Sequence, residues 1–131
     1  MSGYGFTSLE ELGEGPGFRK VRRALDVTAF GVNGVVMAPG FEGFAHFHYE
    51  QDELYFVHRG RARVEIGDET RELGEGGLLY VESTTPRKVS NASDTDELVL
   101  LVVGGKGGYV ERDGMLVDPE RDLARRQAFG H

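Results

Sequence analysis

The sequence predicts an all-β domain of the sandwich, jelly-roll or barrel type, and two observations support this prediction. Short strand-like runs, about eight of them, follow one another between Gly, Pro, Asn and Asp breaks with no long helix among them. The chain also holds 20 Gly and 4 Pro in 131 residues, a share above the average for globular proteins. Short strands joined by frequent turns are typical of antiparallel sheets that pack face to face or close into a barrel.

The chain has the size and composition of one folded domain. A length of 131 residues lies within the usual range for a single domain. With 39% hydrophobic and 28% charged residues, the chain can bury a core and still solvate its surface, which excludes extensive disorder. We therefore expect residues 1–131 to form a single domain.

The N-terminal region predicts one helical turn followed by an edge strand. Residues 7–12 contain the pattern Ser-x-x-Glu, in which Glu11 can reach back to the amide of Ser8. After a Gly-rich break, residues 18–23 begin a strand that is unusually basic. Its charged residues are Arg19, Lys20, Arg22 and Arg23. We expect this stretch to be a solvated edge, since charge discourages pairing with other chains, and the alternative is an anion-binding site.

Further strands are expected at residues 27–30, 35–38, 44–48, 53–58, 62–66, 78–81, 88–91 and 97–103. Polar and apolar residues alternate over 61–66, which predicts a strand with one face in the core, and Gly67 and Asp68 predict a hairpin turn after it. Residues 98–103 are apolar throughout, which predicts a strand buried on both faces. A short helix is expected to begin at 118–120, where Asp stands in the N-cap place and Pro at the first helical position.

Charge and residue usage exclude several classes of protein. Lys and Arg number 15 and Asp and Glu 22, so the net charge of −7 repels nucleic acid. No apolar run approaches the roughly 20 residues of a membrane span and no leader pattern is present, so we expect no membrane partner and a cytoplasmic location. The absence of Cys excludes disulfides and thiolate ligands and leaves His, Asp and Glu as candidate metal ligands.

The residues most suited to chemistry lie between Gly40 and Gly60. Because side chains two apart on a strand share a face, His46 and His48 project together. A polar four-residue break then lets Glu53 open the next strand and approach the two imidazoles. Two His and one carboxylate on adjacent strands form the facial arrangement that binds Fe(II) and other divalent metals with open coordination positions.

The spacing Gly-x5-His-x-His-x4-Glu-x6-Gly, from Gly40 to Gly60, is that of the first cupin motif at every specified position. The chain resembles the small single-domain members of the cupin superfamily. The resemblance implies a cupin-type double-stranded β-helix, or jelly-roll barrel, over residues 18–110. A helical turn and arm over 1–17 would precede the barrel, and a tail with a short helix over 111–131 would follow it.

The second cupin motif is degenerate here. Residues 76–91 keep the first Gly, the apolar strand, a Pro before the ligand position and the closing Asn, but Arg87 stands where the family places its third His. A guanidinium cannot ligate a cation, so a metal would have three protein ligands or none. In one interpretation, His46, His48 and Glu53 bind a divalent metal. Arg87 then pairs with a carboxylate or phosphate of the substrate. In the other, Arg87 neutralises Glu53 and the histidines are ordinary core residues.

The metal trio is His46, His48 and Glu53, and the expected ion is Fe, Mn, Ni, Co or Zn. Phe44 and Tyr55 share strand faces with these ligands and are expected to line a partly apolar substrate pocket, whereas His58 falls on the opposite face.

We expect a metal-dependent enzyme of the oxygenase, isomerase or decarboxylase type that acts on a small anionic metabolite. The alternatives are a non-enzymatic small-molecule binding module and a metal-independent isomerase that uses His46 or His48 as its base. Long apolar strands and the charged N-terminal strand also predict a homodimer. Gly60 is expected to adopt a positive φ.

Overall fold

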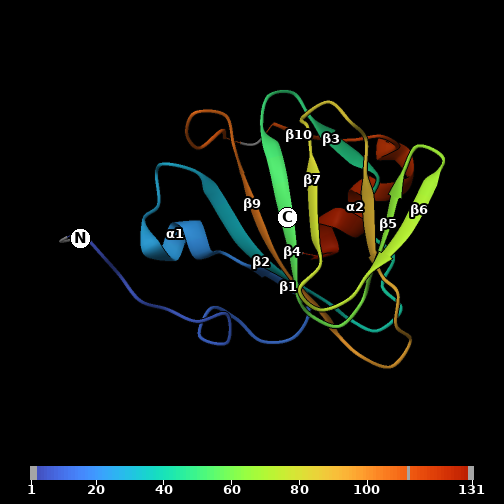
Figure 1. Cartoon of the computed structure of the whole chain (residues 1–131), viewed down its shortest axis with the longest axis horizontal. Coiled ribbons are helices and arrows are strands. Elements are labelled where there is room, and N and C mark those ends of the chain that lie inside the picture. The colour runs from blue at the N-terminus through green and yellow to red at the C-terminus, as the bar shows by residue number, and fades with distance from the viewer. Residues whose placement is uncertain (1–2, 112, 130–131) are drawn as a thin grey trace.

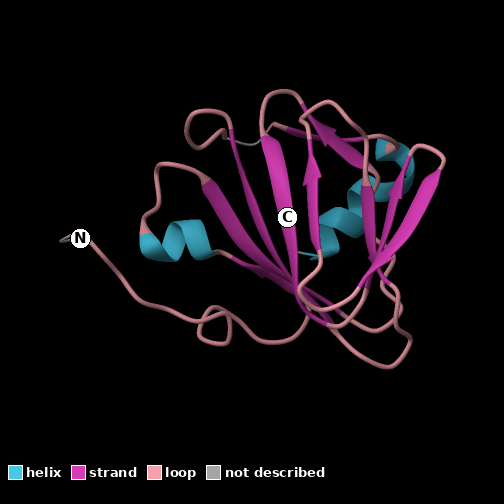
Figure 2. Ribbon diagram, viewed as in Figure 1, coloured by secondary structure: helices cyan, strands magenta, loops and turns pink. Residues whose placement is uncertain are grey.

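The computed structural model describes residues 3–111 and 113–129, which form ten strands and two helices (Figure 1). The strands are β1 (Gly17–Arg19), β2 (Gly31–Met37), β3 (His46–His48), β4 (Asp52–Arg59), β5 (Ala62–Ile66), β6 (Glu69–Leu73), β7 (Leu78–Val81), β8 (Lys88–Asn91), β9 (Leu98–Gly105) and β10 (Gly114–Leu116). The helices are α1 (Val21–Leu25) and α2 (Pro119–Phe129). Strands dominate the chain in Figure 2, so the all-β prediction is confirmed.

The strands form three antiparallel sheets. A five-stranded sheet has the order β1-β2-β9-β4-β7, a three-stranded sheet the order β6-β5-β8, and β10 pairs with β3. The core lies between the two larger sheets and is built from Val35, Met37, Tyr55, Val57, Ala62, Val64, Val81, Val89, Leu98 and Leu100. These residues alternate along their strands, so each sheet buries one face against the other.

Three predicted strands have the observed bounds, namely those at residues 62–66, 78–81 and 88–91. The hairpin turn predicted at Gly67 and Asp68 joins β5 to β6. Strand β9 lies in the middle of its sheet, between β2 and β4. The side chains of Leu98, Val99 and Leu100 are buried and those of the following three residues are half-buried.

The region between β1 and β2 differs from the prediction. The strand expected over 18–23 ends at Arg19, and α1 follows because Arg, Ala and Leu favour a helix and no Gly or Pro interrupts them. Helix α1 ends at Leu25, and the next residue, Asp26, caps it with a left-handed φ of 55°. The strand expected over 27–30 is wrong, because this stretch is the connection that leads from α1 into one long β2.

The sequence analysis did not predict strands β6 and β10. Strand β6 is exposed and mostly charged, so no apolar pattern marks it, and it forms by pairing with β5 across the hairpin. Strand β10 has only three residues and pairs with β3, in register Gly114 to His48. Both strands are specified by their partners more than by their own composition.

The two terminal regions of the chain form a turn and a helix. At the N-terminal end, residues 9–12 form a turn in which the Glu11 amide donates to Ser8 Oγ at 3.2 Å. At the C-terminal end, α2 begins after Asp118, as predicted, and its last residue, Phe129, packs against the rings of Phe18 and Phe41. The end of α2 is therefore fixed beside β1.

Of the helices that the structure describes, none combines the length and apolar character needed to cross a membrane. A cytoplasmic location stays a prediction.

Candidate metal centre and its cavity

The trio predicted from the sequence comes together in the structure. His46 and His48 lie on β3, and Glu53 lies near the start of β4. The turn between these strands is held by Asp113, whose Oδ2 accepts the amides of Glu50 at 2.7 Å and Gln51 at 3.0 Å. This clamp returns the chain so that β4 begins beside the two imidazoles.

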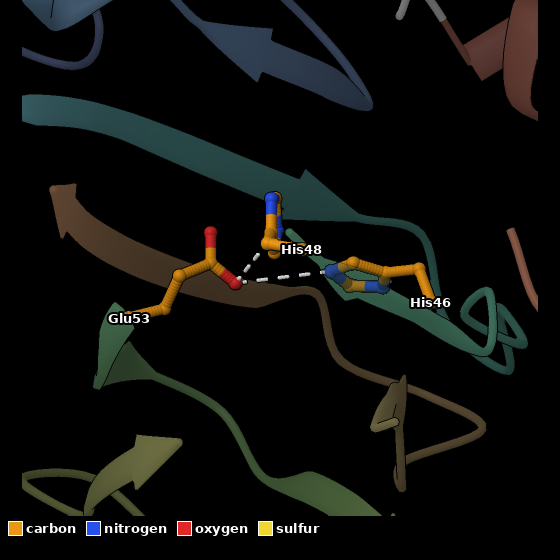
Figure 3. A group of neighbouring side chains, drawn as sticks. All are labelled: His46, His48 and Glu53. Atoms are coloured by element: carbon orange, nitrogen blue, oxygen red, sulfur yellow. Dashed lines mark ion pairs between the residues drawn. The ribbon is translucent and has the colours of Figure 1, made fainter. Parts of the chain in front are cut away.

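The three side chains point toward one another (Figure 3). Their ligand atoms all lie within 4.8 Å of one another. Glu53 Oε1 lies 3.2 Å from His48 Nε2 and 3.8 Å from His46 Nε2. The arrangement has the donor types and the facial disposition that a divalent metal requires.

The outer nitrogens of both imidazoles are held by acceptors. His46 Nδ1 lies 3.1 Å from the carbonyl oxygen of Phe44, and His48 Nδ1 lies 2.9 Å from Asp113 Oδ1. A carbonyl or carboxylate oxygen can only accept, and the contact of His48 Nδ1 with Asp113 is shorter than its 3.1 Å contact with Gln51 Nε2, so we assign the proton of each ring to Nδ1. Both Nε2 atoms then direct a lone pair toward Glu53, and histidines that bind metals commonly donate their other N–H to a carbonyl or carboxylate in this way.

His48 Nε2 provides the test of whether a metal fits. This atom is buried and has no hydrogen-bond partner among the described residues, although Glu53 Oε1 is close. A nitrogen lone pair that faces a carboxylate oxygen is repelled unless a cation or proton lies between them. The residues present therefore fit a bound divalent metal.

The pKa values of Glu53 and His48 are both shifted toward the charged form. Burial raises the pKa of Glu53, but the hydrogen bonds and charge that His46 and His48 supply when protonated outweigh it and hold this pKa well below its usual range. Burial lowers the pKa of His48, but Glu53 and Asp113 outweigh it, and the pKa is raised overall. Glu53 is thus an ionised carboxylate, and a proton on His48 competes with a metal for the same position.

Arg87 lies beside the trio. Its backbone pairs with that of His46, and its side chain is buried with Nη2 3.7 Å from Glu53 Oε1. The guanidinium also donates to the carbonyl of Ser83 at 3.2 Å and that of Glu82 at 3.4 Å. The trio also adjoins a cavity, and Arg87 is not among the described residues that line this cavity. These contacts favour the interpretation in which Arg87 balances Glu53, and binding of an anionic ligand by Arg87 stays a prediction.

A cavity of about 310 Å³ adjoins the trio and is lined by His46, His48 and Glu53 themselves. Phe44 and Tyr55 lie on its wall, and their contribution to substrate binding stays a prediction. Tyr55 donates to Glu53 Oε1 at 2.7 Å, and burial raises the pKa of Tyr55 well above its usual value. Tyr55 is therefore a permanent donor to the carboxylate.

Sequence reasoning missed two residues at this site. Gln51 lies inside the four-residue break of the motif and donates to Glu53 Oε2 at 3.3 Å, so its position between two ligands was an available signal. Asp113 is 65 residues beyond His48, and no local pattern connects the two. His58 is exposed on β4, as its position in the strand predicts.

Comparison with known proteins adds the family context. The cupin domain family matches residues 34–104, a span that contains all three candidate ligands. A cupin protein from Bacteroides fragilis superposes with a TM-score of 0.68, at 23% identity over 85% of this chain and 91% of that one. A sugar phosphate isomerase of the cupin superfamily from Silicibacter pomeroyi gives a TM-score of 0.62, at 25% identity over 68% of this chain and 58% of that one.

One curated relative, an uncharacterised protein from Methanocaldococcus jannaschii, is 26% identical over 65 residues, which are 50% of this chain and 52% of the relative. The chain spans about half the length of the curated relatives it matches. The likeness to the Bacteroides protein confirms the double-stranded β-helix fold.

Proposed function

This chain belongs to the cupin family, and we propose that it is a metal-dependent enzyme acting on a small organic anion inside the barrel. One observation carries the proposal. Three ligand atoms of His46, His48 and Glu53 converge within 4.8 Å, and one of them, His48 Nε2, is buried without a hydrogen-bond partner among the described residues.

Each neighbouring residue has a definite task in this proposal. The carbonyl of Phe44 and the carboxylate of Asp113 orient the two imidazoles so that both Nε2 atoms face inward. Tyr55 and Arg87 hold Glu53 in place. A divalent metal held by the trio would supply a Lewis acid that polarises a substrate oxygen.

A metal held by three protein ligands supports oxygenase, isomerase or decarboxylase chemistry, and the proposal covers these three reaction types. Likeness to a sugar phosphate isomerase supports an anionic substrate. A cytoplasmic location and a homodimer belong to the same proposal.

Metal content tests the proposal directly. Elemental analysis of the untagged protein is expected to give about one equivalent of Fe, Mn, Ni, Co or Zn per chain. The variant His48→Ala is expected to lose that metal while its circular dichroism spectrum stays β-like, because it removes a ligand and little core volume. His58→Ala, on the exposed face of β4, is the matched control and keeps its metal. Equal metal content in the two variants would refute the ligand assignment.

A second candidate function is a metal-free binding module. Glu53 already has a donor in Tyr55 and a cation in Arg87, so the carboxylate is compensated without a metal. In that case the purified protein is free of metal, and an organic ligand binds equally well to wild type and to His48→Ala.

A further inference from the structure

The cavity has a second polar end that the metal centre does not use. Among its lining residues are Lys20 just after β1, Arg22 and Arg23 on α1, and Arg126 on α2. We call these four residues the basic cluster. None of them forms an ion pair with any carboxylate of the described chain. Four unpaired cations around one cavity, in a chain with a net charge of −7, mark a local positive field.

Arg126 differs from the other two arginines on its helix. Arg121 pairs with Glu42 at 2.8 Å, and Arg125 pairs with Asp122 at 3.0 Å. Arg126 lines the cavity instead, and its Nε is buried with no hydrogen-bond partner in the described structure. A buried guanidinium N–H without an acceptor is costly, so the position calls for an acceptor brought by a ligand.

The fold explains why residues far apart in the sequence gather here. Phe18 on β1 packs edge-on against Phe129 at the end of α2, with ring centroids 5.3 Å apart. This contact brings the last turn of α2, which carries Arg126, to the start of the basic stretch at Lys20. Arg22 is steadied by the ring of Tyr109, 3.9 Å from its guanidinium carbon.

Lys20 of the basic cluster directly follows β1, and Glu53 of the metal trio lies on β4 of the same sheet. The order β1-β2-β9-β4 places three strand spacings, about 14 Å, between the backbones of β1 and β4. Between them, Glu53 is in register with Gly104 and Gly104 with Gly31, and both glycines line the cavity. Neither glycine has a side chain, and the side chains of Gln51 and Tyr109 cover this row: a Cβ added at Gly104 would lie 3.2 Å from Gln51, and one added at Gly31 would lie 3.4 Å from the Tyr109 ring.

The wall that joins the two ends is mainly apolar. It includes Val32, Val35, Met37, Phe44, Leu100 and Val102. An apolar wall with a few convergent charged groups is the usual form of a site for a small organic ligand.

We infer that the cavity binds an amphipathic organic anion, whose carboxylate or phosphate lies against the basic cluster and whose apolar body lies along β2 and β9. The far end of such a ligand reaches toward His46, His48 and Glu53, and this last part rests on the proposed function. The sequence left two interpretations of the basic stretch, a solvated edge and an anion-binding site. The cavity supports the anion-binding site. Guanidinium groups suit it because they bind carboxylate and phosphate through paired hydrogen bonds.

Isothermal titration of the full chain with hexanoate and with hexyl phosphate tests the inference and separates the two head groups. At least one of these probes is expected to bind saturably. Hexanol, which lacks the charge, and inorganic phosphate, which lacks the apolar body, are each expected to bind at least about tenfold more weakly. Arg126→Gln is expected to weaken the bound probe about tenfold.

Arg121→Gln, on the same helix but paired with Glu42, is the matched control and leaves affinity within about twofold of wild type. Arg23→Gln, at the exposed rim, weakens binding in the same direction as Arg126→Gln and keeps the test decisive if the latter misfolds. Equal effects of Arg126→Gln and Arg121→Gln, or no saturable binding of either probe, would overturn the inference.

The same titration with a chelator present, and with His48→Ala, separates the two proposals. Binding of the anion by metal-free protein supports the basic cluster even where metal analysis refutes the metal centre. Loss of probe binding in Arg126→Gln with the metal retained leaves the metal centre standing.

Discussion

The two ends of the cavity differ in how their polar groups are balanced. At the metal centre, the protein itself supplies partners for the outer nitrogens of His46 and His48 and for both oxygens of Glu53. At the basic cluster, the described chain supplies no carboxylate at all, and Arg126 Nε is buried without an acceptor. The metal centre therefore holds its imidazoles and carboxylate in a fixed geometry, whereas the basic cluster is suited to an anionic ligand.

Two arginines, the buried Arg87 and the half-buried Arg126, differ in the partners of their guanidinium groups. Both Nε atoms are buried without a hydrogen-bond partner among the described residues, but the Nη atoms of Arg87 have Glu53 and two carbonyls around them, whereas Arg126 has none of these. Replacing Arg87 with Gln is expected to destabilise the metal-free protein by about 3 kcal/mol, because it leaves a buried carboxylate without its cation. The same change is expected to raise metal affinity, since a positive charge beside the site is removed.

Urea unfolding of chelated protein and titration with Zn²⁺ measure the two effects of Arg87→Gln. Arg61→Gln, which breaks an exposed pair with Glu72, is the control and costs no more than about 0.5 kcal/mol. A stability loss in Arg87→Gln as small as that of Arg61→Gln would contradict the structural role assigned to Arg87.

Gly60 lies outside both ends of the cavity, so a substitution there affects the fold and not the site. Gly60 has a φ of +87°, as predicted, and a Cβ added there would lie 2.4 Å from the carbonyl oxygen of Glu97. Gly60→Val is therefore expected to destabilise the protein by about 2 kcal/mol or more, while the folded fraction keeps its metal. Gly74→Val, at a position with open space around it, serves as the control in thermal melts. Equal melting temperatures for the two variants would show that Gly60 carries no strain.

The smallest expected effect concerns the residue that orients His48. Asp113→Asn removes the charge that faces His48 Nδ1 and one of the acceptors for the turn before β4. Metal affinity is expected to fall about tenfold to a hundredfold, with the stoichiometry unchanged. Asp68→Asn, in the exposed hairpin turn, is the control for loss of one negative charge. Zn²⁺ titration of the two variants decides, and identical affinities would refute a positioning role for Asp113.

Local patterns account for what the sequence could predict. The alternation in β5, the i and i+2 spacing of His46 and His48, and the return of the chain to Glu53 are all encoded within a few residues, and the structure has each of them. The place of Arg87 beside Glu53 was one of the two interpretations left open, because the motif indicated the position but not the partner.

What the sequence could not predict depends on contacts between distant segments. Strand β10 exists because it pairs with β3, and Asp113 reaches His48 only through that pairing. The basic stretch was expected to be a solvated edge because Arg126 lies more than a hundred residues away, and no local pattern shows that α2 returns to β1.

Anomalous diffraction from crystals soaked with Zn²⁺ tests the central claim most directly, because it locates the ion and its ligands together. The account predicts one strong anomalous peak at about 2.0–2.2 Å from His46 Nε2, His48 Nε2 and a Glu53 oxygen, with Arg87 outside the coordination shell. No peak at the trio, with the ion bound elsewhere or nowhere, would contradict it.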